Sequence, residues 1–550
     1  EIPRMKIVVV GAVAGGASAA TRARRLAESA DIVLFERGTV PSFANCGMPY
    51  YVGGEITDRA KLLVTPPERL RRRYHLDLRL QTEVVAIDRA RQVVVARDLT
   101  TGREYEESYD KLILSPGAAP LRPPLPGSDH PQIYTLRELR DCDRIKAAID
   151  RGATDVLIIG AGFIGLEMAE NCVRRNLKTT IVERNQQILP PWDIEMTTTA
   201  AAHLRQHQID LRLGDQVVSY ADEAGRVRVS YQSGATQVVD FVILSVGVKP
   251  ENSLAVAAGL EIGTRGGIRV NEYLQTSDPH IYAVGDAIEV RDFVLGESTQ
   301  IPLAGPANRQ GRLAADHLSD QNPPPYRGTQ GTAILRLFEM TVAMTGASEK
   351  SLRRAGREYR KIYIHPAQHA GYYPGAESMT IKLLFAPTDG QILGAQIAGG
   401  EGVDKRIDVL AVAIQARLTV FDLEHLELAY SPQFGSAKDP INMAGFVAAG
   451  LLRGDHPQIA VDELPTLAAG TSLVDVRMPS EFQAGSIPGA INIPVDDLRD
   501  RLHELPVDRP LVVYCQVGMR GYLSTRILMQ HGYQVRNLSG GYRSYQLATG

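Results

Sequence analysis

Cysteine is the residue type in this sequence that most directly suggests chemistry. The 550-residue chain has four cysteines, and no two of them form a CxxC or CxxxxC pair. A disulfide framework is therefore not expected, and so few cysteines favour a reducing, cytoplasmic setting. Cys46 and Cys515 lie in short segments that would position a reactive sulfur, whereas Cys142 and Cys172 have no such context.

Cys46 lies in the segment SFANCGMPYY, a loop rich in serine, asparagine and glycine. Because no second cysteine is near it, this thiol cannot form an internal disulfide. It must instead cycle between a thiolate and a mixed disulfide, a persulfide or a sulfenic acid. The segment therefore predicts a single-thiol redox centre.

Cys515 follows an apolar strand, Leu511–Tyr514, and precedes a helix, with the loop CQVGMR between them. Backbone N–H groups of such a loop, at a helix N-terminus, surround a sulfur atom and stabilise a thiolate or persulfide anion. Arg520 adds positive charge. We expect Cys515 to carry a transferable sulfur atom, and Asp475 and Arg477 to brace the loop.

The scaffold for these thiols is indicated by a repeated pattern of strand, glycine turn, helix, strand and acid. The glycines of the two turns are Gly11, Gly15 and Gly16 in the first copy, and Gly160, Gly162 and Gly165 in the second. Such glycines let the backbone approach a pyrophosphate at the helix N-terminus, and the acids, Glu36 and Glu183, accept hydrogen bonds from ribose. Two copies predict two dinucleotide sites, although Val13 replaces the middle glycine of the first.

Three further segments resemble the pyridine nucleotide-disulfide reductase family. TSDPHIYAVGDAI (276–288) resembles its second FAD signature, and LILSPGAAP (112–120) and VILSVGVKPE (242–251) resemble its two crossover segments. The resemblance covers roughly residues 5–442. It implies that the first turn binds FAD and the second binds the nicotinamide cofactor.

The same resemblance implies a set of residues for each cofactor. The FAD set is Gly11, Ala14, Gly15, Gly16, Glu36, Arg37, Asn45, Ser115, Gly117, Gly285, Asp286 and Ala304. The nicotinamide set is Gly160, Gly162, Ile164, Gly165, Glu183 and Gly247. The carboxylate of Glu183 favours NADH because it would repel the 2′-phosphate of NADPH, although the neighbouring Arg184 leaves NADPH open.

The Cys46 segment closely resembles the coenzyme A disulfide reductase branch of this family. Tyr51 stands where most members have a second cysteine, and in this branch coenzyme A supplies the missing sulfur. The main competing branch, of NADH oxidases and peroxidases, has a histidine where this chain has Ala14. The resemblance therefore implies thiol exchange with a substrate and argues against peroxide chemistry.

Coenzyme A carries several phosphate groups, so its binding requires cations near the thiol. The expected coenzyme A residues are Arg22, Arg25, Ser42, Asn45, Arg71 and Arg73. HAGYYPG (369–375) and AYSPQFGSAKDP (429–440) resemble the dimerisation domain of the same branch. There Tyr373 and Tyr430 would reach the cysteine of the other subunit and donate a proton to the leaving thiolate, while Tyr372 would only pack.

After Gly450 the chain changes to a polar segment and then resembles a single rhodanese domain almost end to end. We therefore predict an α/β chain with two Rossmann-like domains, for FAD and NAD, an α+β dimerisation domain and a C-terminal α/β rhodanese domain. The predicted boundaries are 5–120 with 250–325 for the FAD domain, 121–249 for the NAD(P)H domain, 326–450 for the dimerisation domain, 451–463 for a linker and 464–550 for the rhodanese domain.

These expectations combine into one predicted activity, the reduction by NADH of sulfur–sulfur bonds in coenzyme A persulfide or polysulfide. Electrons would pass through FAD to Cys46, and Cys515 would transfer sulfur. Coenzyme A disulfide reduction, peroxide or oxygen reduction, and a role as sulfur carrier or sensor remain alternatives.

No nucleic-acid or membrane partner is expected for the predicted homodimer. The net charge is −3, and the apolar run Ile7–Ala20 is glycine-rich and too short to span a bilayer. His203 and His207 are spaced as zinc ligands can be, but the glutamate of HExxH is missing. We expect them to form a solvated helix face without metal.

Overall fold

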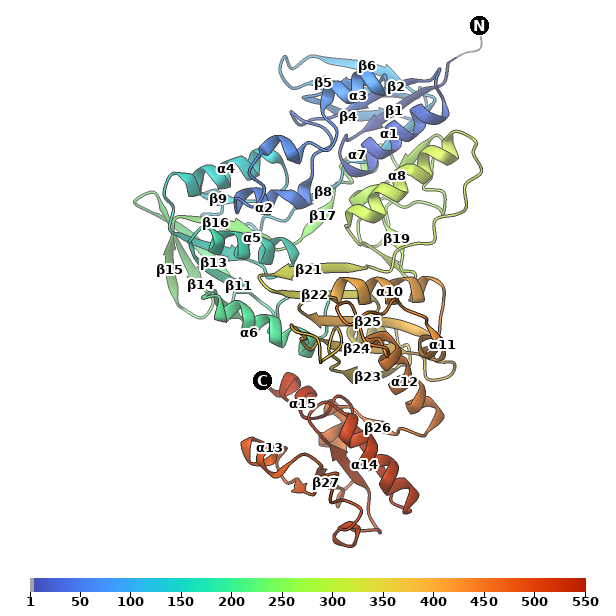
Figure 1. Ribbon diagram of the computed structural model, residues 1–550. Coiled ribbons are helices and arrows are strands. Elements are labelled where there is room, and N and C mark those ends of the chain that lie inside the picture. Colours follow the sequence, from blue (N-terminus) through green and yellow to red (C-terminus); the bar gives the residue numbers. More distant parts are fainter. Residues whose placement is uncertain (1–3) are drawn as a thin grey trace. The chain divides into compact units, whose positions relative to one another are not determined.

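Figure 1 shows a computed structural model of the chain, in which residues 4–550 are described. Its contacts divide it into two compact units. The N-terminal unit runs to Gln186 and continues over Gln208–Gly331, and the C-terminal unit comprises Gln187–His207 and Thr332–Gly550. The predicted α/β class is confirmed, but residues 187–207, placed by sequence in the NAD(P)H domain, pack with the C-terminal unit.

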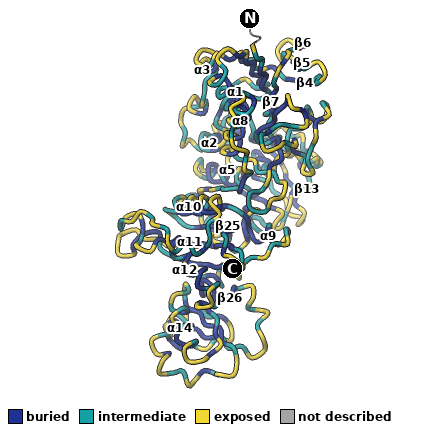
Figure 2. Tube along the Cα trace, turned by 90° about the vertical axis from the view of Figure 1, so that its right-hand side faces the viewer, coloured by how far each residue is buried: buried dark blue, intermediate teal, exposed yellow. Residues whose placement is uncertain are grey.

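The first sheet of the N-terminal unit is parallel, with strand order β18-β7-β1-β2-β3. Its strands are β1 (Lys6–Val10), β2 (Asp31–Phe35), β3 (Asp77–Arg79), β7 (Lys111–Leu114) and β18 (Ile281–Ala283). Helices α1 (Ala14–Leu26) and α8 (Ala304–Leu318) pack together so closely that a Cβ atom at Gly311 would lie 2.2 Å from the Gly15 oxygen. The β-branched strands are almost fully buried, as the dark blue segments of Figure 2 show.

The second sheet of this unit is also parallel, with strand order β12-β11-β10-β16-β9. Its strands are β9 (Ile133–Tyr134), β10 (Asp155–Ile159), β11 (Lys178–Glu183), β12 (Asp210–Leu213) and β16 (Phe241–Leu244), and its helices include α4 (Leu139–Asp150) and α5 (Phe163–Arg174). The two predicted crossover segments lie side by side, because β8 (Ala118–Pro120) pairs with β17 (Val248–Pro250). The unit also has two three-stranded antiparallel sheets. One consists of β4 (Thr82–Asp88), β5 (Val93–Asp98) and β6 (Glu104–Ser108), and the other of β13 (Val217–Glu223), β14 (Arg226–Tyr231) and β15 (Thr236–Val239).

The C-terminal unit contains an antiparallel sheet with strand order β21-β22-β25-β24-β23. Its strands are β21 (Ala333–Leu337), β22 (Met340–Gly346), β23 (Arg360–Ile364), β24 (Thr380–Phe385) and β25 (Ile392–Gly399). Helices α10 (Val403–Gln415), α11 (Val420–His425) and α12 (Pro440–Arg453) accompany the sheet, and α6 (Thr198–Gln206) of the segment 187–207 lies beside β22.

The chain ends in a parallel sheet with strand order β26-β30-β29-β27-β28. Its strands are β26 (Gln458–Ile459), β27 (Ser472–Asp475), β28 (Ile491–Asn492), β29 (Leu511–Tyr514) and β30 (Val535–Leu538), and its helices are α13 (Pro479–Ala484), α14 (Met519–Gln530) and α15 (Gly541–Thr549). The segment predicted as a linker, 451–463, is ordered structure: it begins inside α12 and includes β26. The reason is that Ile459 buries its side chain in this sheet.

None of the helices between residues 4 and 550 combines the length and the hydrophobicity needed to cross a bilayer.

A buried lysine holds the segment 187–207 against the antiparallel sheet. Lys382, on β24, is fully buried, and its Nζ lies 2.8 Å from Asp193 and 2.5 Å from Glu195 of the segment. The same nitrogen bonds to Glu349. Charges can be buried in this way only because each is paired with an opposite charge.

Replacing Lys382 by methionine is expected to destabilise the protein by about 3–5 kcal/mol at pH 7, because buried carboxylates lose their counter-charge. Burial alone would raise the pKa of Glu349, but the charges of Lys382 and Lys361 outweigh burial and lower that pKa to about 2. A depressed pKa of this kind stabilises the native protein above the ordinary glutamate pKa of about 4.3. The stabilisation is lost as the pH falls towards 2.

In Lys382→Met the buried carboxylates protonate more readily, and protonation removes their unpaired charge. The free energy of unfolding, measured with urea, should therefore fall further below that of the wild-type protein at pH 8 than at pH 5. Lys438→Met, at an exposed position of the same unit, should change the free energy of unfolding by less than about 0.5 kcal/mol. Equal losses at both pH values, or an equal loss in the control, would contradict this account of the cluster.

Candidate functional site

The first glycine turn has no room for side chains at two of its glycines. Gly11 has a φ of +95°, and a Cβ atom there would lie 2.1 Å from the Ser115 carbonyl oxygen. A Cβ atom at Gly16, in α1, would lie 1.8 Å from the Gly11 oxygen. The turn is therefore packed backbone against backbone, which brings the start of α1 close to the ends of β1 and β7.

The second turn repeats this packing. A Cβ atom at Gly160, whose φ is +101°, would lie 2.4 Å from the Ser245 oxygen, and one at Gly165 would lie 2.0 Å from the Gly160 oxygen. At Gly162 a Cβ atom would meet no protein atom within 4 Å. The space beside Gly162 is therefore open for a pyrophosphate to approach the backbone at the start of α5.

The predicted acids lie at these turns in matching positions. Glu36 Oε2 accepts a hydrogen bond of 2.9 Å from the Ala12 N–H, and Oε1 accepts one of 2.7 Å from the Gly38 N–H. Glu183 Oε2 accepts a hydrogen bond of 3.0 Å from the Ala161 N–H. The correspondence shows that the sequence repeat is also a structural repeat.

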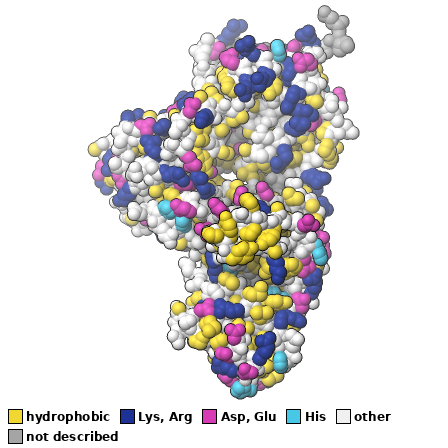
Figure 3. Space-filling model, viewed as in Figure 1, with side chains coloured by type: hydrophobic (Ala, Val, Ile, Leu, Met, Phe, Trp, Pro, Cys, Tyr) yellow, Lys and Arg dark blue, Asp and Glu magenta, His cyan; other side chains and the backbone are white. Residues whose placement is uncertain are grey.

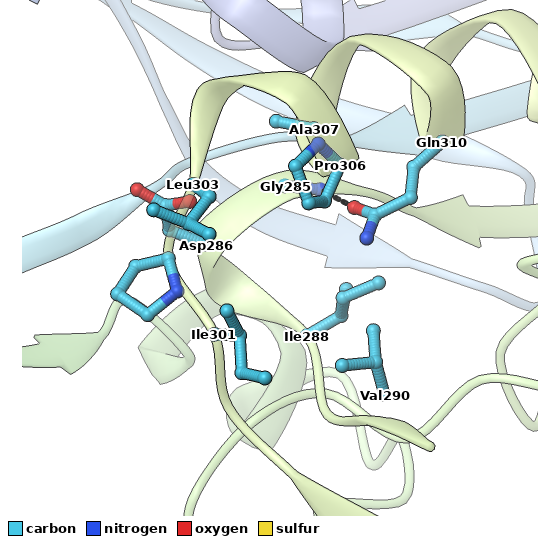
Figure 4. A pocket seen from close by; sticks show the side chains of 10 residues that line it. Gly285, Asp286, Ile288, Val290, Ile301, Leu303, Pro306, Ala307 and Gln310 are labelled. Carbon is cyan, nitrogen blue, oxygen red and sulfur yellow. Dashed lines mark hydrogen bonds between the residues drawn. The ribbon is translucent and has the colours of Figure 1, made fainter. Parts of the chain in front are cut away.

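A pocket at the start of α8 contains the residues of the predicted second FAD signature (Figure 4). Gly285 donates its N–H to Gln310 Oε1 at 2.7 Å. The Asp286 carboxylate accepts no hydrogen bond from any of residues 4–550. Burial raises the pKa of Asp286, and the charge of Arg137 lowers it in part. A carboxylate with no protein donor suits the hydroxyl groups of a polyol.

The other predicted cofactor residues lie at helix starts or at the ends of adjoining strands: Ala14, Gly15, Ala304 and Ile164 in the first turns of α1, α8 and α5, Ser115 and Gly117 after β7, and Gly247 after β16. Arg37, which the resemblance implies for FAD binding, is part of an ion-paired cluster. Its Nη2 lies 2.9 Å from Glu251 Oε2, and Arg137 lies 3.0 Å from the same atom. Burial would raise the pKa of Glu251, but the two arginines lower it, so this residue keeps its charge.

Cys46 lies in a 3-10 turn, Asn45–Gly47, that leads into α2 (Met48–Val52). Although the residue as a whole is exposed, desolvation by the protein around its thiol raises the pKa of Cys46. The charges of Glu167 and Asp286 raise this pKa further, and a backbone hydrogen bond lowers it in part. The predicted redox thiol, the predicted FAD aspartate and the α5 helix of the second turn therefore meet in one region.

Glu167 is a residue of this region that our sequence reasoning missed. Burial raises its pKa to about 7, and the Tyr50 hydroxyl donates it a hydrogen bond of 3.0 Å. It lies one helical turn after Ile164, on α5. A signal was present in the sequence, since an acid in the otherwise apolar stretch FIGLEMA is unusual for a buried helix.

The residues expected to bind coenzyme A are only partly free to do so. Arg22 lies 2.5 Å from Asp316, and Arg71 donates to the Leu78 carbonyl oxygen at 3.1 Å. Arg25, Asn45 and Arg73 are exposed, and Ser42 is half-buried with a φ of +47°. Figure 3 shows basic side chains gathered over α1 and α3 (Pro67–Arg73).

The predicted catalytic tyrosines lie on exposed loops of the C-terminal unit. The exposed fractions of Tyr373 and Tyr430 are 39% and 51%. Tyr372, expected only to pack, is 75% exposed, and its hydroxyl lies 3.0 Å from the Tyr430 hydroxyl. Figure 3 shows a hydrophobic patch on this face of the unit.

A buried arginine fastens both tyrosine loops. Arg406 donates to Asp439 Oδ2 at 2.9 Å and to the Gln368 carbonyl oxygen at 2.7 Å, and both Arg406 and Asp439 are almost fully buried. Gln368 precedes the Tyr373 loop, and Asp439 closes the Tyr430 loop. The position of each tyrosine thus depends on the same ion pair.

The Cys515 sulfur is enclosed by its own loop. The Gly518 N–H donates to Sγ at 3.1 Å, and Cys515 is buried. Arg520 makes two hydrogen bonds of 2.7 Å to the Glu481 carboxylate, which lower the pKa of Glu481 to about 2. We predicted that the positive charge of Arg520 acts on the Cys515 sulfur, but this charge is also paired with Glu481. No spacing pattern in the sequence indicated the Arg520–Glu481 pair.

Two buried polar contacts brace this loop from behind. Arg477 lies 2.6 Å from Asp475 and donates to Gln516 Oε1 at 3.0 Å. Asn537 donates to the Gly518 carbonyl oxygen at 3.0 Å. The backbone that faces the sulfur is therefore held by side chains from two neighbouring strands.

Comparison with protein families agrees with this geometry. The family described as pyridine nucleotide-disulphide oxidoreductase matches residues 5–311, and the dimerisation domain of that family matches residues 333–439. This chain belongs to the pyridine nucleotide-disulphide oxidoreductase family. A rhodanese-like domain matches residues 460–548.

Individual members of the family cover most of the chain. A coenzyme A disulfide reductase of Staphylococcus aureus is 35% identical over 444 residues, which are 80% of this chain and 99% of the relative. The structure of reduced Bacillus anthracis CoADR-RHD is 48% identical with a TM-score of 0.97, covering 99% of this chain and 98% of that one. The structure of an NAD-dependent persulfide reductase from A. fulgidus is 34% identical with a TM-score of 0.91, covering 98% and 100%.

Membership of this family implies FAD and a nicotinamide cofactor, and the residues of this chain fit both. The carboxylate of Asp286 lacks a protein donor, and the space beside Gly162 is open. FAD would be held by the first turn with Glu36 and Asp286, and the nicotinamide cofactor by the second turn with Glu183.

Glu167→Gln is expected to lower the pKa of Cys46, because it removes one of the two charges that raise it. Since the pKa of Glu167 is about 7, the effect should appear only above that pH, where the wild-type carboxylate is charged. At pH 8 we expect iodoacetamide to alkylate Cys46 of the reduced holoenzyme roughly threefold faster in the variant. Glu68→Gln, at an exposed position on α3, is the control, and equal rates in Glu167→Gln and wild type at every pH would refute the coupling.

Proposed function

We propose that this chain is an FAD-dependent reductase that uses NADH to reduce the sulfur–sulfur bond of coenzyme A persulfide or a related polysulfide. The observation that carries the proposal is the environment of its thiols. Of the cysteines among residues 4–550, Cys46 alone is exposed, and no second thiol is placed to form a disulfide with it. A substrate must therefore supply the second sulfur of the redox cycle.

In the first step the Cys46 thiolate attacks the inner sulfur of the persulfide. A Cys46–S–S–CoA bond forms, the sulfur–sulfur bond of the persulfide breaks, and the outer sulfur leaves as hydrosulfide. Two electrons and a proton from NADH and solvent then return Cys46 to the thiolate and release coenzyme A as the thiol. Bound FAD supplies the means of passing the electron pair from NADH to sulfur.

The groups around the thiol have separate roles in this proposal. The exposed Arg25 and Arg73, with Ser42 and Asn45, bind the coenzyme A moiety. Tyr373 and Tyr430 of the partner subunit in a homodimer protonate the leaving sulfur. The dimerisation domain matched by the chain and the exposed tyrosine loops support this assignment.

NADH is the proposed reductant, because the carboxylate of Glu183, buried at the second glycine turn, would repel a 2′-phosphate. Cys515 is proposed to deliver sulfur to coenzyme A or to accept it from other carriers. The enclosed sulfur, the Gly518 N–H and the Arg520 guanidinium support a persulfide at this position. A cytoplasmic location accords with the reduced state that both thiols need.

Reduction of coenzyme A disulfide is the second candidate, and a specific observation favours it. Relatives of 35–36% identity over 80% of the chain are named coenzyme A disulfide reductases. The same Cys46 attack would then release a second coenzyme A thiolate in place of hydrosulfide. The rhodanese-like domain at residues 460–548 favours the persulfide.

Substitution of Cys46 and of Cys515 should have different effects on the two proposed activities. Cys46→Ser is expected to keep a flavin spectrum but to lose NADH-dependent sulfide release from coenzyme A persulfide by at least about 1,000-fold, because the thiolate is the attacking group. Cys515→Ser should keep that release when coenzyme A persulfide is supplied directly, and should lose sulfur transfer from thiosulfate. Cys172→Ala, in the core of α5, is the control and should retain both activities. Sulfide release that persists in Cys46→Ser would refute the proposal.

A further inference from the structure

The helix α6 and the hairpin between β21 and β22 bring three metal-binding side chains together. His203 lies on α6, and His207, one helical turn later, is the C-cap of that helix. Glu339 lies in the hairpin turn, 132 residues further along the chain than His207. Glu339 Oε2 is 3.1 Å from His203 Nε2 and 3.0 Å from His207 Nε2. All of these atoms belong to the C-terminal unit.

The spacing of these atoms is close to that of ligands around one ion. The three donor atoms lie within 4.8 Å of one another. Around a tetrahedral Zn²⁺ with bonds of about 2.0–2.1 Å, neighbouring donor atoms are about 3.4 Å apart. The two distances from Glu339 Oε2 to the imidazole nitrogens, 3.1 and 3.0 Å, are within a few tenths of an ångström of this spacing.

The donor set is one that zinc uses in proteins. Two imidazoles and one carboxylate with an open fourth position form a known zinc-binding set, and imidazole nitrogen favours ions such as Zn²⁺ over Mg²⁺ or Ca²⁺. The side chains of His203 and His207 are 21% and 29% exposed. Solvent can thus reach the site and supply the fourth ligand.

Packing orients the ligands before any ion arrives. The His207 ring stacks on Phe338 with a centroid distance of 3.7 Å, and the His203 ring meets the His207 ring edge-on at 4.8 Å. Phe338 has a φ of +55°, a left-handed conformation that is costly for a residue with a side chain. This turn conformation directs Phe338 to the histidine and Glu339 to both imidazole nitrogens.

A second group of acids in the same unit is not available to a metal ion. Asp193, Glu195 and Glu349 also lie close together, but the ammonium group of Lys382 occupies their centre. A cation is already present there, as part of the protein. The two histidines and Glu339 are not centred on any lysine or arginine in the described part of the chain.

We propose that His203, His207 and Glu339 bind a divalent transition-metal ion, Zn²⁺ foremost, which clamps α6 to the β21–β22 hairpin. The expectation from sequence, a solvated helix face, took account of the two histidines but not of the third ligand. The site lies outside the residues assigned to sulfur chemistry, so its existence does not depend on the proposed function. Because the ion competes with protons for imidazole, its affinity falls as the pH is lowered.

The test is equilibrium dialysis of the chelator-treated, FAD-loaded full chain against Zn²⁺ at pH 7.5, with the metal content measured per chain. Thiolates also bind zinc, so binding is measured in a Cys46→Ser/Cys515→Ser background. We expect one ion per chain in that background, and an affinity at least 10-fold weaker in His207→Ala and in Glu339→Gln. His425→Ala, at the end of α11, is the matched histidine control and should bind as the background does.

The melting temperature distinguishes loss of the metal site from poor folding of a variant. Glu339 is 75% exposed, so Glu339→Gln should melt at the background temperature without metal. Zn²⁺ should raise the melting temperature of the background but not that of Glu339→Gln. Absence of a bound ion in the Cys46→Ser/Cys515→Ser background, or unchanged affinity in both His207→Ala and Glu339→Gln, would overturn the proposal.

Discussion

Two contacts between backbone atoms constrain the catalytic half of this protein: Gly16 against the Gly11 oxygen, and Gly165 against the Gly160 oxygen. Even a methyl group would clash at these positions, so the first turns of α1 and α5 can pack against the glycine loops only with glycine there. Once the helices start there, Glu36 and Glu183 bond to the turns, and α5 carries Glu167 towards the Cys46 loop. The electrostatic surroundings of the thiol thus follow from the packing of the turns.

Features set by local spacing could be predicted from the sequence. The glycine turns with their acids and the loop around Cys515 are both confirmed as structure. Each of them depends on residues close in the chain or on a pattern that repeats. Their role in binding cofactors and substrate remains a prediction.

Features set by distant residues could not be predicted in this way. The segment 187–207 joins the C-terminal unit through Lys382, which lies far along the chain. Arg22, expected to bind coenzyme A, and Arg37, expected to bind FAD, are paired with Asp316 and Glu251. In each case a charge is satisfied by a partner that no local motif specifies, because burial of a charge selects for any nearby opposite charge.

The two reactive cysteines have opposite physical environments. Cys46 is exposed, so a substrate can reach its thiol from outside, and the carboxylates beside it raise the pKa of that thiol. Cys515 is buried under a backbone N–H and a nearby guanidinium, so it is suited to hold a sulfur anion. This difference supports our proposal that the first thiol carries out reduction and the second stores or transfers sulfur.

The central claim is that Cys46 reduces a sulfane sulfur. The most direct measurement is steady-state NADH oxidation by the purified holoenzyme with coenzyme A persulfide, polysulfide, coenzyme A disulfide and hydrogen peroxide, compared as kcat/KM. The account predicts the highest value for coenzyme A persulfide, with sulfide released in proportion to NADH consumed. A higher value for coenzyme A disulfide, or for peroxide, would contradict it.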